Sequence, residues 1–283
     1  MYGDAFDKFL TRDDSLRKRI DQAVSPSMDS NTEPLIAVIG YPIADNPAEF
    51  ALDRAFAAMG LDWRVISFEI PSGRLGAALD GTVALGFHGV LIDQGLSELA
   101  ARWFRQRYHS SQTQDLPAHV DCFSRSDLAA AEGAAAPGVD DLRETWLKER
   151  VRSHFGSRGR RPARLLRLPT RASDQPLPFA ESLSPIRYRR CPEPEQLAEA
   201  DIIVVEAPLT REQAALVWPA DDASTLVIEL ADDAVTPAAR FGYRVITTDA
   251  IRAGVLCQAV RRWTGRDADA EIICDAIEEY GSV

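Results

Sequence analysis

The sequence predicts an α/β fold with two sheet-containing units and a helical C-terminal tail. Short apolar segments typical of buried strands alternate with segments that repeat apolar residues at helical spacing, first over about residues 35–123 and again over about 164–247. This alternation indicates mainly parallel sheets with helices on their faces. The 283 residues are enough for two ordinary domains, and 46% of them are hydrophobic, as a packed core requires.

The first alternating set has clear start and stop signals. Asn46-Pro47 suits a helix start, because proline at the first helical position needs no hydrogen-bond donor, and Gly60 suits the end of that helix. Apolar residues recur at helical spacing between these two signals. We expect strands over 35–39, 63–70, 89–93 and 118–123, and helices over 48–59, 72–80 and 96–106.

The second set follows the low-complexity connector Ala129–Gly138. Thr210 and Gln213 have the spacing of a capping box at a helix N-terminus. We expect helices over 139–155, 210–217, 237–241, 250–263 and 268–280, and strands over 164–168, 185–189, 201–207, 225–230 and 243–247. The expected division is an extension over 1–33, one domain over 34–138 completed by helices within 250–283, and a second domain over 139–249.

The composition excludes several classes of protein. A chain with 27% charged residues and a net charge of −11 is neither collagen-like nor disordered. No apolar run approaches the roughly 20 residues of a membrane span, and four cysteines without a CxxC spacing suggest neither a disulfide framework nor a zinc site. The four histidines form no metal-ligand pattern. We therefore expect a soluble, cytoplasmic protein without a metal.

The charge is distributed unevenly. Residues 143–190 contain 13 basic and 4 acidic side chains, whereas the rest of the chain contains 19 basic and 39 acidic ones. The basic segment could bind nucleic acid, a phosphorylated ligand or an acidic partner. Nucleic acid is the less favoured choice, because no aromatic residues for base stacking are interleaved with the arginines. The favoured interpretation is pairing with the acidic remainder of the protein, within the chain or across a homodimer.

Residues 1–33 form a separate feature. Apolar residues between Phe6 and Ile20 fall at roughly helical spacing, and residues 25–32 have the composition of a flexible linker. A helix docked on the main body is the favoured interpretation, and a partner-binding helix is the alternative.

Three strings in the sequence resemble the shikimate dehydrogenase family. They are AVIGYPIADNPAEFALDRAFAAMGLDWRVISFEIP at 37–71 followed by LGFHGVLID at 85–93, then ADIIVVEAPLT at 200–210, and GYRVITTDAIRAGVLCQAVRRWTGRDADAEIICDAI at 242–277. They match the family in order and spacing over most of residues 34–283. The resemblance implies a two-domain architecture, with a parallel-sheet substrate domain and a Rossmann-like domain. It also implies a cytoplasmic NADPH-dependent reduction of 3-dehydroshikimate, a step of aromatic amino acid biosynthesis.

The site residues that the resemblance implies are mostly altered. The family's serine pair, which holds the substrate carboxylate, is matched by Asn46 and Ala48. Asp45 and Glu49 beside them would repel an anionic substrate, since two charges about 4 Å apart interact by roughly 4 kcal/mol at an effective dielectric near 20. For the protein as a whole, the expected ligand is a small-molecule carboxylate or polyol.

The catalytic lysine of the family is matched by Ser97, which cannot carry a positive charge and is a poorer proton donor. Asp93 precedes it, and the next substrate contact of the family is matched by Asp121. Only Asp140 and Gln258 keep the residue type of a substrate-contacting position. Asp140 is therefore the candidate catalytic residue, although a helix N-terminal charge is about as good an interpretation.

The dinucleotide motif of the family is missing. The strand over 164–168 is followed by Pro169–Pro176, which contains no glycine that would let the backbone approach a pyrophosphate. About 16 residues separate this strand from the next, whereas a helix–strand–helix excursion needs on the order of 30 or more. A reduced Rossmann-like domain without NADP is the expectation.

These observations leave three hypotheses open. The favoured one is a catalytically degenerate homologue, a pseudoenzyme used in ligand binding or assembly. The second is an active NADP-dependent oxidoreductase on shikimate or a related hydroxy acid, with Asp45, Asn46, Asp93 and Ser97 lining an altered site. The third is an interaction protein that uses residues 1–33 and the basic segment.

Overall fold

The computed structural model describes residues 33–108, 116–125, 139–168, 177–188, 191–231 and 236–282. The chain divides into two compact units, Met1–Pro34 and Leu35–Val283, and the fold described below is that of the second. The helix and linker expected within residues 1–33, the connector at 129–138 and the Pro169–Pro176 segment lie outside the described residues.

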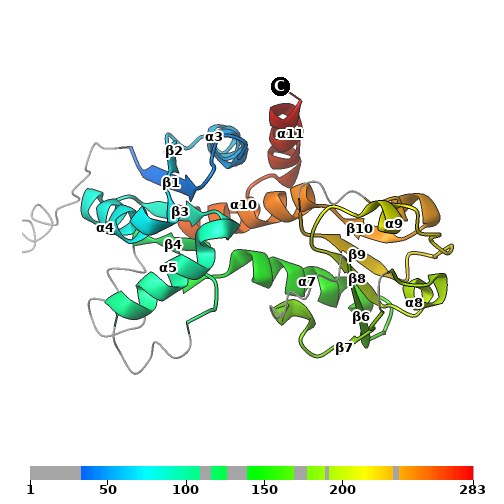
Figure 1. Ribbon diagram of the computed structural model, residues 1–283. Coiled ribbons are helices and arrows are strands. Elements are labelled where there is room, and N and C mark those ends of the chain that lie inside the picture. Colours follow the sequence, from blue (N-terminus) through cyan, green and yellow to red (C-terminus); the bar gives the residue numbers. More distant parts are fainter. Residues whose placement is uncertain are drawn as a thin grey trace, which may run out of the picture. The chain divides into compact units, whose positions relative to one another are not determined.

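The first sheet has the strand order β2-β1-β3-β4-β5 (Figure 1). Its strands are β1 (Leu35–Gly40), β2 (Arg64–Glu69), β3 (Gly89–Ile92), β4 (Cys122–Ser124) and β5 (Val139–Asp140). β1 is parallel to β2 and β3, whereas β4 is antiparallel to both of its neighbours. The carboxyl ends of β1, β3 and β5 therefore meet the start of β4 at one edge, which we call the carboxyl edge.

Helices cover both faces of this sheet. α3 (Ala48–Ala58), α10 (Thr248–Thr264) and α11 (Ala270–Gly281) share one apolar core with β1 and β4. On the other face, α4 (Leu75–Leu85), which follows the 3₁₀ turn η1 (Ser72–Arg74), and α5 (Gln94–Arg107) share a second core with the same sheet. The C-terminal helices thus complete the first sheet unit, although they are the last elements in the sequence.

The second sheet is entirely parallel, with the order β10-β9-β8-β6-β7. Its strands are β6 (Arg164–Leu168), β7 (Ser184–Pro185), β8 (Ile202–Val205), β9 (Leu226–Glu229) and β10 (Arg244–Ile246). The helices and turns between them are short: η3 (Pro178–Ala180), α8 (Pro194–Ala198), α9 (Arg211–Ala214) and η4 (Ala238–Phe241). β7 is an edge strand, where proline is tolerated because no further strand needs its missing N–H group. The α/β fold class is confirmed.

Several element boundaries differ from the expected ones for local reasons. The helix expected from residue 139 is α7 (Leu142–Gly156), because Val139–Asp140 first pairs with β4 and Asp141 then caps the helix. The strand expected over 185–189 is reduced to β7. The helix expected over 210–217 ends at Ala214, although its predicted capping box is present. α8, which starts at Pro194, is not among the helices expected from the sequence.

α7 and α10 pack closely against each other (Figure 1). The contact depends on Gly254, because a Cβ atom there would lie 2.0 Å from the indole nitrogen of Trp146. Trp146 belongs to the apolar core of the second sheet, and α10 also contributes to the core of the first. These two helices therefore link the cores of the two sheets.

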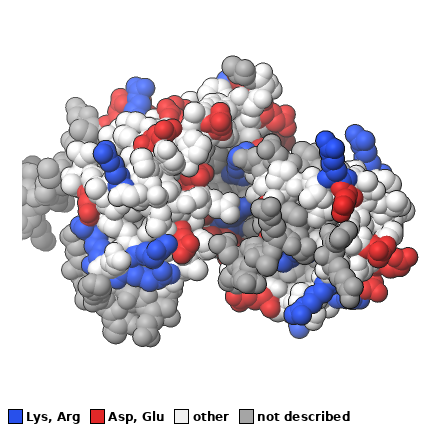
Figure 2. Space-filling model, viewed as in Figure 1, with Lys and Arg blue, Asp and Glu red and all other residues white. Residues whose placement is uncertain are grey.

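Three arginines of the basic segment pair with acidic residues of the same chain. Arg160 lies 3.0 Å from Asp201, and Arg164 lies 2.7 Å from Glu199. Arg167 forms an ion pair with Glu206, which follows the neighbouring strand. On the face seen in Figure 2, basic and acidic side chains are interspersed. Within the described residues, no helix is long and apolar enough to cross a membrane.

Candidate functional site

The carboxyl edge collects the starts of three helices, α3, α5 and α7. Asn46 accepts a hydrogen bond from the backbone N–H of Ala48 at 2.9 Å and so caps α3. Asp93 accepts from the N–H of Gly95 at 3.3 Å and caps α5. The amide nitrogen of Asn46 also donates to Asp93 at 3.4 Å, which joins the two caps. Two of the predicted substrate-binding residues therefore lie together and hold helix ends.

α7 is capped by two carboxylates. Asp121 accepts from the backbone N–H groups of Leu142 and Arg143 at 2.7 and 2.9 Å, and Asp141 accepts from Glu144 at 2.9 Å. Burial raises the pKa of Asp121 to about 7, against the two N–H donors that lower it. Burial also raises the pKa of Asp141, while the Glu144 N–H and the charge of His119 act in the opposite direction. The helix end is thus a buried, acidic part of the carboxyl edge.

Ser97 lies on α5 and is only 2% exposed. Its hydroxyl oxygen lies 2.8 Å from the carbonyl oxygen of Gln94 and 3.2 Å from Nδ1 of His119. The segment that carries His119 is fixed to the same helix, because the N–H of Val120 donates to the carbonyl oxygen of Ser97. At the position that matches the family's catalytic lysine, the structure therefore has a buried hydroxyl next to an imidazole.

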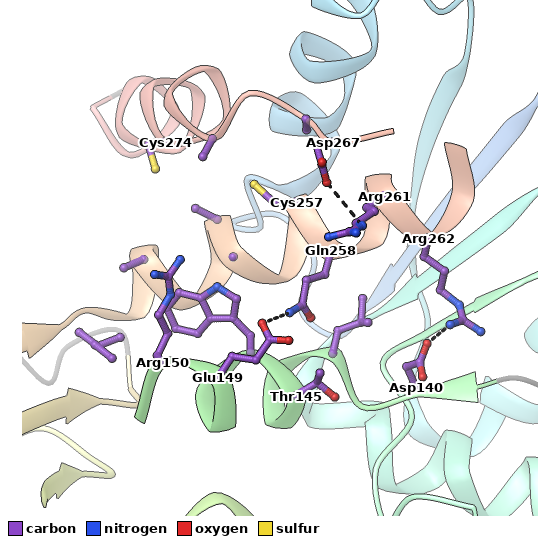
Figure 3. A pocket seen from close by; sticks show the side chains of 18 of the residues that line it. Asp140, Thr145, Glu149, Arg150, Cys257, Gln258, Arg261, Arg262, Asp267 and Cys274 are labelled. Atoms are coloured by element: carbon purple, nitrogen blue, oxygen red, sulfur yellow. Dashed lines mark hydrogen bonds and ion pairs between the residues drawn. The ribbon is translucent and has the colours of Figure 1, made fainter. Parts of the chain in front are cut away.

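Asp140 points to the opposite face of the first sheet from Asp121. It pairs with Cys122 of β4, whose side chain lies in the core that α10 shares, and cross-strand partners point to the same face. Its carboxylate forms an ion pair with Arg262 of α10 (Figure 3). Gln258 lies one helical turn before Arg262 and donates to Glu149 of α7 at 3.4 Å. Asp140, the candidate catalytic residue, and Gln258, a candidate substrate-binding residue, therefore lie on the α10 side of the first sheet, away from Ser97.

Asp140 and Gln258 line a groove of about 1060 Å³, which we call the α10 groove. It is bounded by α7, α10, β10 and the start of α11 (Figure 3). Its charged side chains are Asp140, Glu149, Arg150, Arg244, Arg261, Arg262 and Asp267. Thr145, Trp146, Cys257 and Cys274 are among the uncharged residues that line it.

Three residues of the carboxyl edge and groove were not singled out from the sequence. Of the neighbours Asp140 and Asp141, only Asp140 is a predicted site residue. The alternation of side chains along strand β5 is the signal that assigns the two aspartates to different places. His119 was assigned no pairing, because its contact with Ser97 spans a loop. Arg150 lies four residues after Trp146, the helical spacing at which two side chains meet, and its guanidinium is 5.0 Å from the indole centroid.

Asp45 is exposed and makes no hydrogen bond or ion pair with a described residue. Glu49, the other acid of this loop, accepts from the backbone N–H of Ser67 at 3.0 Å and so supports the contact of α3 with β2. Within the described residues, no cluster of three or more His, Cys, Asp or Glu side chains could hold a metal ion.

A dinucleotide would be expected at the turn that follows β6. The described part of the β6–β7 connection, Leu177–Leu183, contains only the 3₁₀ turn η3 and no α-helix that could present its N-terminus to a pyrophosphate. The next helix in the chain is the short α8, and the turn directly after β6, Pro169–Pro176, lies outside the described residues.

The comparisons with known proteins identify the fold. No protein-family model and no curated protein matches the sequence. Among solved structures, the chain resembles shikimate 5-dehydrogenase from Thermus thermophilus in complex with NADP(H) and shikimate, at 17% identity and a TM-score of 0.60 over 87% of this chain and 99% of that one. Mycobacterium tuberculosis shikimate dehydrogenase gives 18% identity and a TM-score of 0.58, with 87% and 99% coverage.

A third similar structure is the ligand-free 5-ketofructose reductase of Gluconobacter sp. strain CHM43, at 13% identity and a TM-score of 0.59, with 88% and 99% coverage. All three structures match this chain over nearly their whole length. The protein has the shikimate dehydrogenase fold, and the resemblance expected from the sequence is confirmed at this level.

Proposed function

We propose that the protein is a ligand-binding protein built on the shikimate dehydrogenase fold, without hydride-transfer chemistry. The observation that carries the proposal is Ser97. A lysine in this position would supply a cation and a proton, whereas Ser97 supplies a buried hydroxyl that is already bonded to Gln94 and His119.

Three acidic residues around the start of α7 support the same proposal. Asp121 and Asp141 are occupied as caps of α7, and Asp140 is ion-paired with Arg262. A general base must reach the proton that it removes, and an ion-paired carboxylate is a weaker base than a free one. None of the three carboxylates is therefore arranged as a free catalytic base.

The ligand we propose is a small, uncharged, polyhydroxylated molecule at the carboxyl edge. A carboxylate accepts up to about four hydrogen bonds, so Asp93 and Asp121 keep acceptor sites for ligand hydroxyl groups after capping their helices. The same carboxylates and the exposed Asp45 disfavour an anion such as shikimate. That a protein of this fold is a 5-ketofructose reductase is consistent with such a ligand.

The test is a binding series by isothermal titration calorimetry on the full chain. Shikimate and quinate represent the anions, and 5-ketofructose and fructose represent uncharged polyols, each with and without NADPH. We expect heat from a polyol, none from the anions, and no oxidation of NADPH, followed by its absorbance, in any mixture. Steady NADPH oxidation with dehydroshikimate or 5-ketofructose would overturn the proposal, as would tighter binding of shikimate than of every polyol.

A second candidate is an active NADP-dependent oxidoreductase on shikimate or a related hydroxy acid. It is favoured by the NADP(H) complex of a protein with the same fold and by the imidazole of His119, which could move a proton where lysine is missing. In that case NADPH oxidation would be measurable and would fall at least about tenfold in His119→Gln, and by much less in His88→Gln.

We also propose that the protein is cytoplasmic and binds neither nucleic acid nor a membrane. The ion pairs of Arg160, Arg164 and Arg167 within the chain favour the intramolecular interpretation of the basic segment. A homodimer is compatible with the proposal, and sedimentation of the full chain at two concentrations would test it.

A further inference from the structure

We propose that the α10 groove is a second binding site, separate from the carboxyl edge, for a small phosphorylated molecule that also carries hydroxyl groups. Arg150 and Arg244 would hold the phosphate, and Gln258 would accept a hydrogen bond from a ligand hydroxyl. The proposal does not depend on what binds at the carboxyl edge.

The groove exists because the facing surface of α10 is made of small residues. Ala250, Ala253 and Gly254 line it, and Trp146 of α7 packs directly on Gly254. The indole then forms part of the wall. A volume of about 1060 Å³ is at the upper end of the range of small-molecule sites, about 300–1,000 Å³. The groove can therefore take a whole small molecule.

Two of its four arginines are already neutralised. Arg262 is paired with Asp140, and Arg261 lies 3.5 Å from Asp267 (Figure 3). By contrast, Arg150 and Arg244 form no hydrogen bond or ion pair through their side chains in the part of the chain that the structure describes. These two cations are available to a ligand.

Arg150 and Arg244 both line the α10 groove. The charge of Arg244 lowers the pKa of His154, after the larger effect of burial, so Arg244 lies near this side chain. His154 is four residues after Arg150 on α7, which places the two on the same helix face one turn apart. Arg150 is oriented by its contact with Trp146 at 5.0 Å. Two guanidinium forks match the charge and the oxygens of a phosphate dianion.

Gln258 supplies the second part of the site. Its side-chain oxygen is buried and has no hydrogen-bond partner among the described residues, although its nitrogen donates to Glu149. A buried acceptor left unpaired is unfavourable by about 1–3 kcal/mol, so a donor is expected there. Figure 3 shows Gln258 and Glu149 meeting between α10 and α7, in the same groove as Arg150. Because the side-chain oxygen of Gln258 is buried, a ligand hydroxyl would reach it by separating Gln258 from Glu149, and would then donate to the oxygen and to the freed carboxylate.

The test is calorimetric titration of the full chain with inorganic phosphate, glycerol 3-phosphate, glycerol and glycerate. We expect glycerol 3-phosphate to bind more tightly than phosphate, and glycerol and glycerate to bind more weakly than either. The double variant Arg150→Gln/Arg244→Gln should lose at least about tenfold in affinity for both phosphates. Arg152→Gln, an exposed arginine of α7 outside the groove, is the matched control and should keep wild-type affinity.

Gln258→Leu separates the two parts of the site, because it should weaken glycerol 3-phosphate at least about threefold and leave inorganic phosphate unchanged. The absence of phosphate binding at about 10 mM would overturn the proposal. So would equal losses in the double variant and in Arg152→Gln, or tighter binding of glycerate than of glycerol 3-phosphate. Circular dichroism of each variant confirms that the fold is retained.

Discussion

The carboxyl edge and the α10 groove both contain polar residues that sequence reasoning connects with a substrate, but they differ in what those residues already do. At the carboxyl edge Asn46, Asp93 and Asp121 each hold the start of a helix. In the groove, Arg150 and Arg244 form no hydrogen bond or ion pair with a described residue, and the side-chain oxygen of Gln258 has no partner among these residues. Polar residue types alone therefore do not identify a binding site; what matters is whether their hydrogen bonds are already used.

The difference predicts opposite results of mutation. Asn46, Asp93 and Asp121 at the carboxyl edge should contribute to folding stability, whereas Arg150 and Arg244 in the groove should contribute to binding and little to stability. Each of the following measurements tests this difference between the two regions.

The largest expected effect is the pH dependence that Asp121 imposes. Its pKa of about 7 in the folded protein is above the ordinary value of 3.8, so the folded state holds a proton that the unfolded state loses between these two values. The unfolding free energy should therefore fall as the pH rises from about 4, and this decline should stop above about 7. Roughly three pKa units correspond to at most about 4 kcal/mol.

Urea unfolding of the wild type and Asp121→Asn from about pH 4.5 to about pH 8.5 measures this effect. The stability of the variant relative to the wild type should rise with pH, because its side chain is uncharged throughout. Asp141 and Glu144, whose pKa values burial also raises, are present in both proteins, so their own pH dependence largely cancels in the difference. The charge of Asp141 also raises the pKa of Asp121 and is part of the effect measured. Asp62→Asn, at an exposed position, controls for the loss of one carboxylate. A difference that is constant across the range would contradict the buried, acidic description of this edge.

The next effect concerns how the groove is built. Gly254→Ala should destabilise the protein by about 1–3 kcal/mol, because the new methyl group meets the indole of Trp146. Gly81→Ala is the matched control: Gly81 also lies within a helix, α4, and has no atom within 4 Å of the added carbon. It should stabilise the protein by roughly 0.5–1 kcal/mol through helix propensity. Equal stability of the two variants in urea unfolding would show that α7 and α10 do not depend on the glycine.

Much of this fold could be predicted from sequence, because strands such as β6 and helices such as α10 have strong local patterns. The roles of the site residues could not. Asp140 and Asp141 are neighbours, yet strand alternation sends one toward Arg262 and leaves the other to cap α7. The contact of Ser97 with His119 spans 22 residues and a loop. No local spacing reports such a contact, because it depends on where β4 joins the sheet.

A smaller effect is expected from the cap of α5. Asp93→Ala removes the acceptor for the N–H of Gly95 and the partner of Asn46, and loss of such a cap costs about 1 kcal/mol. Asp45→Ala, in the β1–α3 loop at an exposed position without a described hydrogen bond, should change the stability by less than about 0.5 kcal/mol. Thermal and urea unfolding of the two variants should rank them in this order. The reverse ranking would mean that Asp93 is not a structural cap.

The smallest effect on stability is expected in the groove itself. Arg244→Gln removes a side chain that bonds to no described residue, so its unfolding free energy should lie within about 0.5 kcal/mol of the wild type. Arg150→Gln also loses the contact with Trp146, which at an exposed site is worth about 0.5–1 kcal/mol. If Arg244→Gln were destabilised by more than Asp93→Ala, the groove would be as structural as the carboxyl edge. If instead it stays near wild type while phosphate binding falls about tenfold, the arginine serves the ligand and not the fold.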